Sequence, residues 1–148
     1  MLKIVKAEEK HIPDICKLWV EFMEYTVDIE PIPWFEKEHL RPAMQDPNSL
    51  ILVASDGDKT VGYAYALIME PLTVETRGKY GNIHDLFVAR DCRRRGVGEQ
   101  LYKAMLKWFC ARDIERVELH IISRNRLASS FWRKQGFTDF EQKMFRRI

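Results

Sequence analysis

The sequence lacks the patterns that mark disulfide-rich and zinc-binding proteins. Its cysteines are odd in number and form no C-x-x-C pair: Cys16, Cys92 and Cys110. Three of its four histidines are scattered along the chain: His11, His39 and His120. Because their separations suit no metal site, we predict neither a disulfide framework nor a bound metal. Reduced thiols fit a cytoplasmic protein.

Long apolar runs and a strong charge of one sign are also missing. Lys3, Lys6 and Glu8 interrupt the apolar residues near the N-terminus, so we expect neither a signal peptide nor a membrane span. The formal net charge is only +2, which is too small to favour nucleic acid as a partner. There is no internal repeat or linker, so the 148 residues suit one domain.

The chain does contain a central unit from Asn82 to Leu106. Ile83–Val88 reads as a strand, Arg93–Gly98 as a basic turn with two glycines, and Glu99–Leu106 as a helix. The helix has one apolar face at helical spacing: Val97, Leu101, Ala104, Met105 and Trp108. The glycines therefore open a helix that packs on the rest of the protein.

This turn has the features of an anion site. Gly96 and Gly98 allow backbone N–H groups to converge where the positive end of the helix dipole lies, which suits phosphate. Arg93, Arg94 and Arg95 add permanently charged donors that pair with phosphate oxygens. The same arginines would also suit a solvated surface or a patch for nucleic acid. A P-loop is excluded because no Lys-Ser/Thr follows the glycines, and there is no complete G-x-G-x-x-G.

Two motifs in order resemble those of the GCN5-related N-acetyltransferase (GNAT) family. The first, Arg93-x-x-Gly96-x-Gly98 after a strand ending in Phe87-Val88, is similar to the acetyl-CoA signature Q/R-x-x-G-x-G/A. The second resembles the family's later helix and the strand after it: Asn125-x-x-Ala128-x-x-Phe131-Trp132-x-x-x-Gly136-Phe137. The resemblance covers most of the chain, and it is strongest from Asn82 onward.

The resemblance implies an α+β fold with a mixed, mainly antiparallel sheet flanked by about four helices. The sheet would splay open between its fourth and fifth strands, Ile83–Val88 and Arg116–Ile122, and the pantetheine of acetyl-CoA would lie in the gap. By resemblance, the residues that bind this co-substrate are Phe87, Val88, Arg93, Arg94, Arg95, Gly96, Val97, Gly98, Asn125 and Ser129. Asn125 also suits a helix cap.

The remaining elements follow from periodicity and turn signals. We predict strands at Leu2–Lys6, Leu50–Ala54, Val61–Met69, Arg116–Ile122 and Lys143–Arg147. We predict helices from Ile12 to about Met23, at Trp34–Met44, from the glycine turn to about Ala111, and at Arg126–Gln135. A bend at Asp28–Pro33 and a polar loop at Pro71–Gly81 join these elements, and Gly136 ends the last helix.

Acetyl transfer to an amine needs a base, because an alkyl amine with a pKa near 10.4 is protonated at neutral pH. Strand alternation predicts one face with Asn82, His84, Leu86 and Val88, and another with Ile83, Asp85 and Phe87. The family often has a glutamate where Asn82 or His84 stands here. His84 is the better base, Asp85 is the fallback, and a purely structural His84 remains open. By resemblance, the Val88 N–H stabilises the oxyanion.

The sequence departs from the family at a second position. Trp132 stands where a tyrosine usually protonates the leaving thiolate, and an indole N–H is no useful acid. A thiolate of pKa near 8.5 can leave without full protonation. A catalytically weak or inactive CoA-binding regulator that acts through a protein partner is therefore an alternative. We predict direct attack in a ternary complex, because no nucleophile with an adjacent base is evident.

The binding region for the acceptor amine is predicted from acidic and aromatic residues in the first two helices and the segment between them. The acidic ones are Glu21, Glu24, Asp28, Glu30, Glu36 and Glu38, and the aromatic ones are Trp19, Phe22, Tyr25, Trp34 and Phe35. They suit a cationic amine such as a polyamine, an amino sugar or a peptide amine, although an ordinary solvated helix face is the simpler interpretation. The resemblance also implies a homodimer, with the C-terminal strand as the natural edge.

Overall fold

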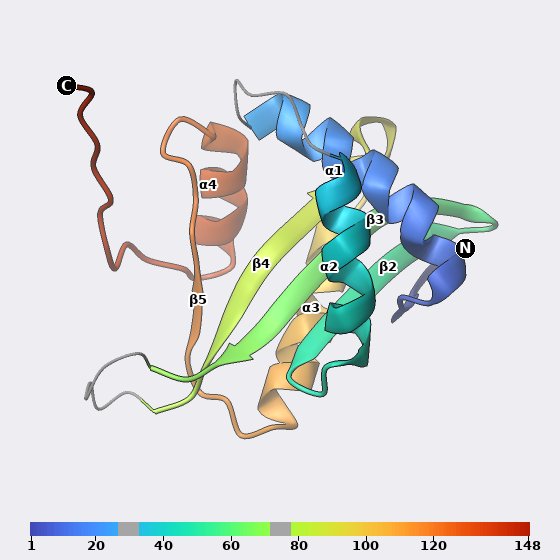
Figure 1. Cartoon of the computed structure of the whole chain (residues 1–148), viewed down its shortest axis with the longest axis horizontal. Helices are drawn as coiled ribbons and strands as arrows, with labels where there is room; N and C mark the ends of the chain where they lie inside the picture. The colour runs from blue at the N-terminus through green and yellow to red at the C-terminus, as the bar shows by residue number, and fades with distance from the viewer. Residues whose placement is uncertain (27–32, 72–77) are drawn as a thin grey trace.

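The structure, a computed structural model, describes residues 1–26, 33–71 and 78–148 as one α+β unit (Figure 1). The strands are β1 (Leu2–Lys6), β2 (Ser49–Asp56), β3 (Lys59–Met69), β4 (Tyr80–Val88) and β5 (Val117–Leu119). The helices are α1 (Ile12–Thr26), α2 (Pro33–Gln45), α3 (Val97–Cys110) and α4 (Arg126–Lys134), with short 3-10 turns at Glu9–His11 and Arg90–Cys92. The predicted bend at Asp28–Pro33 and most of the loop after Pro71 lie outside the described residues.

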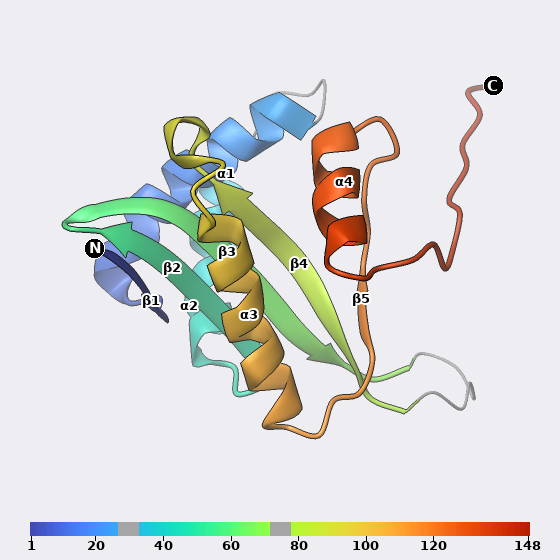
Figure 2. The same ribbon diagram turned by 180° about the vertical axis from the view of Figure 1, so that it is seen from behind.

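The five strands form one sheet in sequence order, from β1 to β5. The first four strands are antiparallel neighbours, and β5 alone runs parallel to its neighbour β4. α1 and α2 cover one face of the sheet, whereas α3 and α4 lie on the opposite side (Figures 1 and 2). The mixed, mainly antiparallel sheet and the four helices confirm the predicted fold class.

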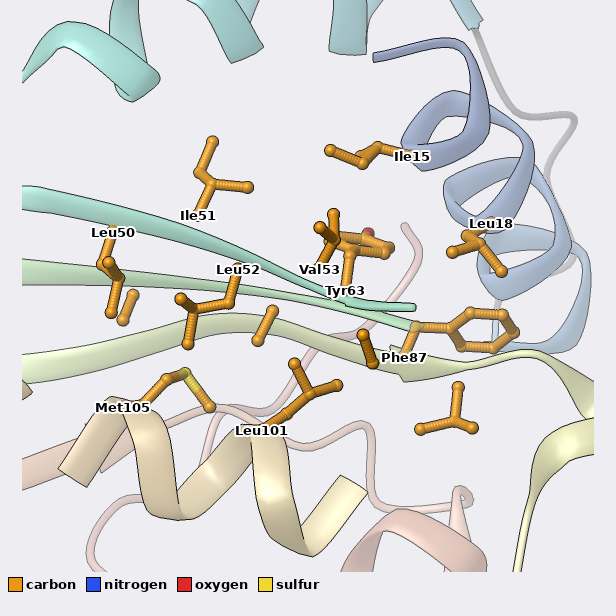
Figure 3. Close-up of a cluster of buried hydrophobic side chains, with 14 of the residues drawn as sticks. Ile15, Leu18, Leu50, Ile51, Leu52, Val53, Tyr63, Phe87, Leu101 and Met105 are labelled. Carbon is orange, nitrogen blue, oxygen red and sulfur yellow. The ribbon is translucent and has the colours of Figure 1, made fainter. Parts of the chain in front are cut away.

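The centre of the sheet is apolar on both faces because helices cover both. Ile51 and Val53 point toward α1, while Leu50 and Leu52 point toward α3 (Figure 3). Side chains from α1 and α3 that meet these faces include Ile15, Leu18, Leu101 and Met105. This two-sided burial explains why β2 reads as a continuous apolar run rather than as an alternating one.

Two strand predictions need correction. Lys143–Arg147 does not form a strand: residues 135–148 contain no helix or strand, and the tail from Thr138 onward is exposed. It has no neighbouring strand to pair with, and exposed backbone alone does not hold a strand. β5 is also shorter than the predicted Arg116–Ile122, because it pairs with β4 at only three positions.

Candidate functional site

β4 and β5 pair at one end and separate at the other. Their register joins Gly81, Asn82 and Ile83 to Val117, Glu118 and Leu119, and stops there. From His84 onward β4 continues to Val88 without β5, and the ribbons diverge toward α4 (Figure 2). The predicted splay between these strands is therefore present. It leaves one backbone edge of the second half of β4 open.

The open edge of β4 ends at Val88. The Ala89 N–H donates to the Val61 carbonyl of β3 at 2.9 Å, so by strand alternation the Val88 N–H and C=O point away from β3. The Val88 carbonyl accepts a hydrogen bond from Arg93 Nε at 3.0 Å. The Val88 N–H is thus directed toward the gap, where it could meet a ligand carbonyl.

Arg93 has a role that sequence reasoning missed. Besides its bond to Val88, its guanidinium lies 5.1 Å from the centre of the Phe87 ring, and Phe87 is buried. These contacts tie the side chain to the end of β4 and hold the loop in place. The acetyl-CoA motif singles out Arg93 as its first residue, but it does not predict either of these contacts.

The loop after Arg93 adopts an unusual backbone that presents N–H groups. Arg94 and Gly96 have positive φ angles of 62° and 77°, and consecutive turns of this kind make a concave nest for anions. Gly96 is the N-cap of α3 and has no side chain with which to cap the helix. The first N–H groups of α3 therefore face outward without a side-chain acceptor, as a phosphate site requires.

Gly98 lies in the first turn of α3, close to two apolar side chains. A Cβ built on it would be 3.5 Å from both Leu86 of β4 and Phe131 of α4. The turn, the open half of β4 and α4 therefore meet at one place. Val97, beside it, is buried in the core.

A second arginine of the turn, Arg95, has a different partner from Arg93. Arg95 Nη2 lies 3.5 Å from Asp56 Oδ2, and the N-terminal ammonium of Met1 lies 3.1 Å from Asp56 Oδ1. The N-terminal ammonium, with a smaller contribution from Arg95, holds the pKa of Asp56 below its usual value. Arg95 thus links the turn to the β2–β3 hairpin, while Arg94 is exposed.

α4 supplies the opposite side of the gap. Asn125 Oδ1 accepts from the Ala128 N–H at 3.1 Å, so Asn125 is the helix cap that the sequence predicted. Ser129 Oγ accepts from Arg133 Nε at 3.2 Å. Trp132 is buried, with its ring 5.5 Å from Tyr102 and 5.3 Å from Phe137. Trp132 is therefore a packing residue that fixes α4 to α3.

His84 occupies a β-bulge. Tyr65 of β3 pairs with Asp85 and Ala66 pairs with Ile83, so the register skips His84, which is the extra residue of the bulge. The bulge changes the predicted alternation. Asp85 shares the face of Tyr65, whereas Ile83 shares that of Ala66, so the prediction that Ile83 and Asp85 lie on one face is wrong.

The bulge also brings His84 and Asp85 together, although neighbouring strand residues normally point to opposite faces. His84 Nδ1 lies 3.3 Å from Asp85 Oδ2, and its ring centre lies 5.1 Å from that of Tyr65. His84 is about half exposed, whereas Asp85 is 8% exposed and its Oδ2 has no hydrogen bond of good geometry to any described residue. Nothing in the sequence, such as a glycine, signals this bulge.

A hollow of about 270 Å³ lies at the C-terminal end of β4 and is lined by Glu21, Glu24, Arg90 and Arg93. Glu21 Oε1 accepts from the Arg90 N–H at 3.1 Å, which leaves Glu24 as the second carboxylate of the wall. Of the predicted acidic residues, Glu38 lies on the exposed surface of α2. Asp28 and Glu30 lie outside the described residues, as does the side chain of Glu36.

The thiol of Cys92, next to the arginines, is no nucleophile. It is 4% exposed, and burial, followed by the hydrogen bond to Asp91, raises its pKa above the usual value. In the part of the chain that the structure describes, no group of three or more potential ligands could hold a metal ion. None of the described helices is long and apolar enough to cross a membrane.

Comparison with protein-family models gives a match to the acetyltransferase (GNAT) family over residues 12–137. This chain belongs to the GNAT family. Among curated proteins, the chain is 28% identical over 74 residues to an uncharacterized N-acetyltransferase, YobR, from Bacillus subtilis strain 168. That match takes in 50% of this GNAT chain but only 30% of the length of YobR.

Solved structures share the fold over the whole chain. An aminoglycoside N-acetyltransferase, AAC(6')-Iy, crystallised with CoA, has a TM-score of 0.85 at 17% identity and covers 100% of this chain and 95% of its own. A transcriptional regulator from Bacillus halodurans C-125 has a TM-score of 0.83 at 18% identity and covers 100% of both chains. At these identities the likeness shows the fold alone.

Proposed function

We propose that this protein is an acetyl-CoA-dependent N-acetyltransferase whose acceptor is a cationic primary amine. The observation that carries the proposal is the uncapped N-terminus of α3, opened by Arg94 and Gly96 and placed beside the open edge of β4. The diphosphate would bind to the N–H groups of that turn, and the pantetheine would run along β4 like an added strand. CoA is present in the solved AAC(6')-Iy structure, which has this fold.

The site residues of this chain would act on the acyl group as follows. The Val88 N–H, which points into the gap, would donate to the thioester oxygen as negative charge develops there. The thiolate has a pKa near 8.5 and can leave as the anion. Attack by the amine is direct, because the nearby thiol of Cys92 is buried and protonated.

The proton of the amine would go to His84, held by Asp85. His84 lies four residues from Val88 along β4, a separation of about 13 Å for extended chain. That distance exceeds a hydrogen bond, so we propose that a chain of water molecules carries the proton to His84. The bulge supports this role, because it places the imidazole on the α1 face beside a buried carboxylate.

Glu21 and Glu24 would bind the cationic acceptor. Their hollow adjoins Arg93, and Arg93 bonds to Val88, so the two carboxylates lie near the place where the thioester would react. Solved structures of this fold include aminoglycoside acetyltransferases, one of them in complex with the bisubstrate analogue CoA-S-monomethyl-acetylneamine. For this chain we propose the same broad class: polyamines, amino sugars or peptide amines.

The test is thiol release from acetyl-CoA with a panel of such amines, comparing wild type with Glu24→Gln. Glu38→Gln, on the exposed surface of α2, is the matched control. We expect Glu24→Gln to raise KM for a cationic amine at least tenfold, with the KM for acetyl-CoA unchanged, and Glu38→Gln to do neither. Turnover restricted to neutral acceptors would contradict the proposed substrate class.

The same assay separates the enzyme from a CoA-binding regulator. Silence with every amine, together with an increase in melting temperature when CoA is added, would favour a regulator. We further propose a reducing cytoplasm as the setting, because Cys16, Cys92 and Cys110 are all free thiols. A homodimer completes the proposal.

A further inference from the structure

The hollow at the C-terminal end of β4 carries charges of both signs. α1 supplies the carboxylates of Glu21 and Glu24. The loop after β4 supplies the guanidinium groups of Arg90 and Arg93. The bond from the Arg90 N–H to Glu21 Oε1 joins the two walls. An acceptor with positive charges only would therefore meet like charge on one side of this hollow.

The two arginines of the hollow differ in the contacts that they already make. Arg93 donates to the Val88 carbonyl at 3.0 Å, and its guanidinium lies over the Phe87 ring. Arg90 is exposed, and its bond to Glu21 uses the backbone N–H and not the side chain. Its guanidinium forms no ion pair with any residue that the structure describes. Arg90 is thus the cationic group of the hollow that a ligand could bind.

Glu24 is the acidic counterpart of Arg90. It is exposed, and within the described part of the chain its carboxylate pairs with neither arginine of the hollow. Two opposite charges that line one space without pairing can each bind the opposite charge of a ligand. A guanidinium binds a carboxylate through two parallel hydrogen bonds, and a carboxylate binds an ammonium group. The hollow is therefore complementary to a molecule that carries both a carboxylate and an ammonium group.

We infer that the acceptor is a diamino acid: its α-carboxylate binds to Arg90, its α-ammonium group binds to Glu21 and Glu24, and its side-chain amine receives the acetyl group. This inference rests on the proposed function and narrows its substrate class. An ammonium group held by carboxylates stays protonated, because nearby negative charge raises the pKa of an amine. Such a group cannot attack the thioester, so the attacking amine must be a second one on the same molecule.

The size and position of the hollow agree with a small acceptor. Its volume of about 270 Å³ is below the roughly 300–1,000 Å³ of pockets that bind drug-sized ligands. Arg93 lines the hollow and also bonds to Val88. A side-chain amine that extends from the hollow past Arg93 would thus approach the Val88 N–H, where the thioester oxygen is proposed to bind.

The transfer needs no further reactant. The side-chain nitrogen forms a bond to the acetyl carbon, the C–S bond breaks, and CoA leaves as the thiolate. The side-chain ammonium group gives up two protons in becoming an amide, one before the attack and one after it. Both would pass through water to His84 and solvent, as proposed above.

The first test compares acceptors that differ only in the carboxylate: free lysine with cadaverine, and ornithine with putrescine. We expect kcat/KM to be at least tenfold higher for the diamino acid of each pair, and mass spectrometry to find the acetyl group on the side-chain nitrogen. An equal or higher kcat/KM for the diamines would overturn this inference but leave the proposed N-acetyltransferase intact. An absence of transfer to every amine would overturn both.

The second test uses Arg90→Gln, which removes the charge but keeps the backbone bond to Glu21. We expect it to raise the KM for lysine at least tenfold and to lower the KM for cadaverine, because the repulsion of its ammonium groups is gone. Arg90→Lys should restore part of the affinity for lysine. Lys17→Gln removes the same charge from an exposed position of α1, one turn before Glu21, and is the matched control that should change neither KM. Equal changes for both substrates in Arg90→Gln would overturn the inference.

Discussion

The position of the His84 side chain depends on the β-bulge in β4. Without the bulge, its imidazole and the Asp85 carboxylate would lie on opposite faces of the sheet. With it, Nδ1 and Oδ2 are 3.3 Å apart. In the proposed mechanism, Asp85 would therefore be the residue that positions His84.

This pairing predicts non-additive effects on rate. We expect His84→Ala to lower kcat about 100-fold, as the loss of a general base does, and Asp85→Asn to lower it about tenfold. In the double variant, adding Asp85→Asn to His84→Ala should not lower kcat further, because the imidazole that Asp85 positions is already absent. Steady-state kinetics of the four proteins measures the coupling. Independent losses that multiply would show that Asp85 acts only on stability.

At Gly96, the nature of the anion site can be tested with an isosteric pair. Asn and Asp tolerate the left-handed conformation with φ of 77° better than other residues, and nothing lies within 4 Å of the added Cβ. Gly96→Asn and Gly96→Asp should therefore fold alike. Because only the aspartate repels phosphate, we expect it to bind CoA at least tenfold more weakly than the asparagine by calorimetry. Equal affinities of the two variants for CoA would show that the diphosphate does not bind at this turn.

At the scale of the element, the contact of β4 with α3 depends on Gly81. A Cβ on this residue would lie 2.5 Å from Cε1 of the Phe109 ring, which is fully buried. The ring cannot move without disturbing the core, so Gly81→Ala should destabilise the protein by about 1–3 kcal/mol in urea unfolding. Gly98→Ala, where the nearest contacts are 3.5 Å, is the control and should leave stability nearly unchanged.

Elements whose signals are local were predicted well. The periodicity of Ile12–Met23 and the cap at Asn125 specify their helices without reference to the rest of the chain. The glycine turn that opens α3 could also be predicted, because two glycines and a following apolar face define it. The bulge at His84 and the partners of Arg93 and Arg95 could not, because they depend on β3 and on the β2–β3 hairpin.

The C-terminal tail, from Thr138 onward, shows a second limit of predicting structure from sequence. Lys143–Arg147 has a strand-forming pattern, but a strand exists only when a neighbour bonds to it. The pattern thus predicts a tendency, and the partner is not encoded in the segment itself.

At the scale of the whole molecule, buried thiol and phenol groups predict loss of stability in alkali. Burial raises the pKa of Cys92 and of Tyr102, so the unfolded chain releases these protons at a lower pH than the folded one. These two groups should therefore leave stability unchanged between about pH 7 and pH 8 and lower it above their unfolded values of about 8.5 and 10.

Urea unfolding at pH 7.5 and 9.5 measures this fall. Cys92→Ala removes the buried thiol and should make the fall smaller, whereas Cys110→Ala, at an exposed position, should leave it as in wild type. A fall of the same size in all three proteins would assign the alkaline sensitivity to groups other than Cys92.

Three residue pairs join β4 to β5, and so short a pairing affects the order in which parts of the protein unfold on heating. Beyond those pairs, β5 and α4 are held to the larger part by an aromatic cluster of Tyr102, Trp132 and Phe137. Because β5 and α4 make few contacts with the rest of the protein, they can unfold before it does. Activity should then disappear on heating while most of the sheet is still intact, because the part of the molecule that would close the proposed acyl-binding gap is also the part that unfolds first.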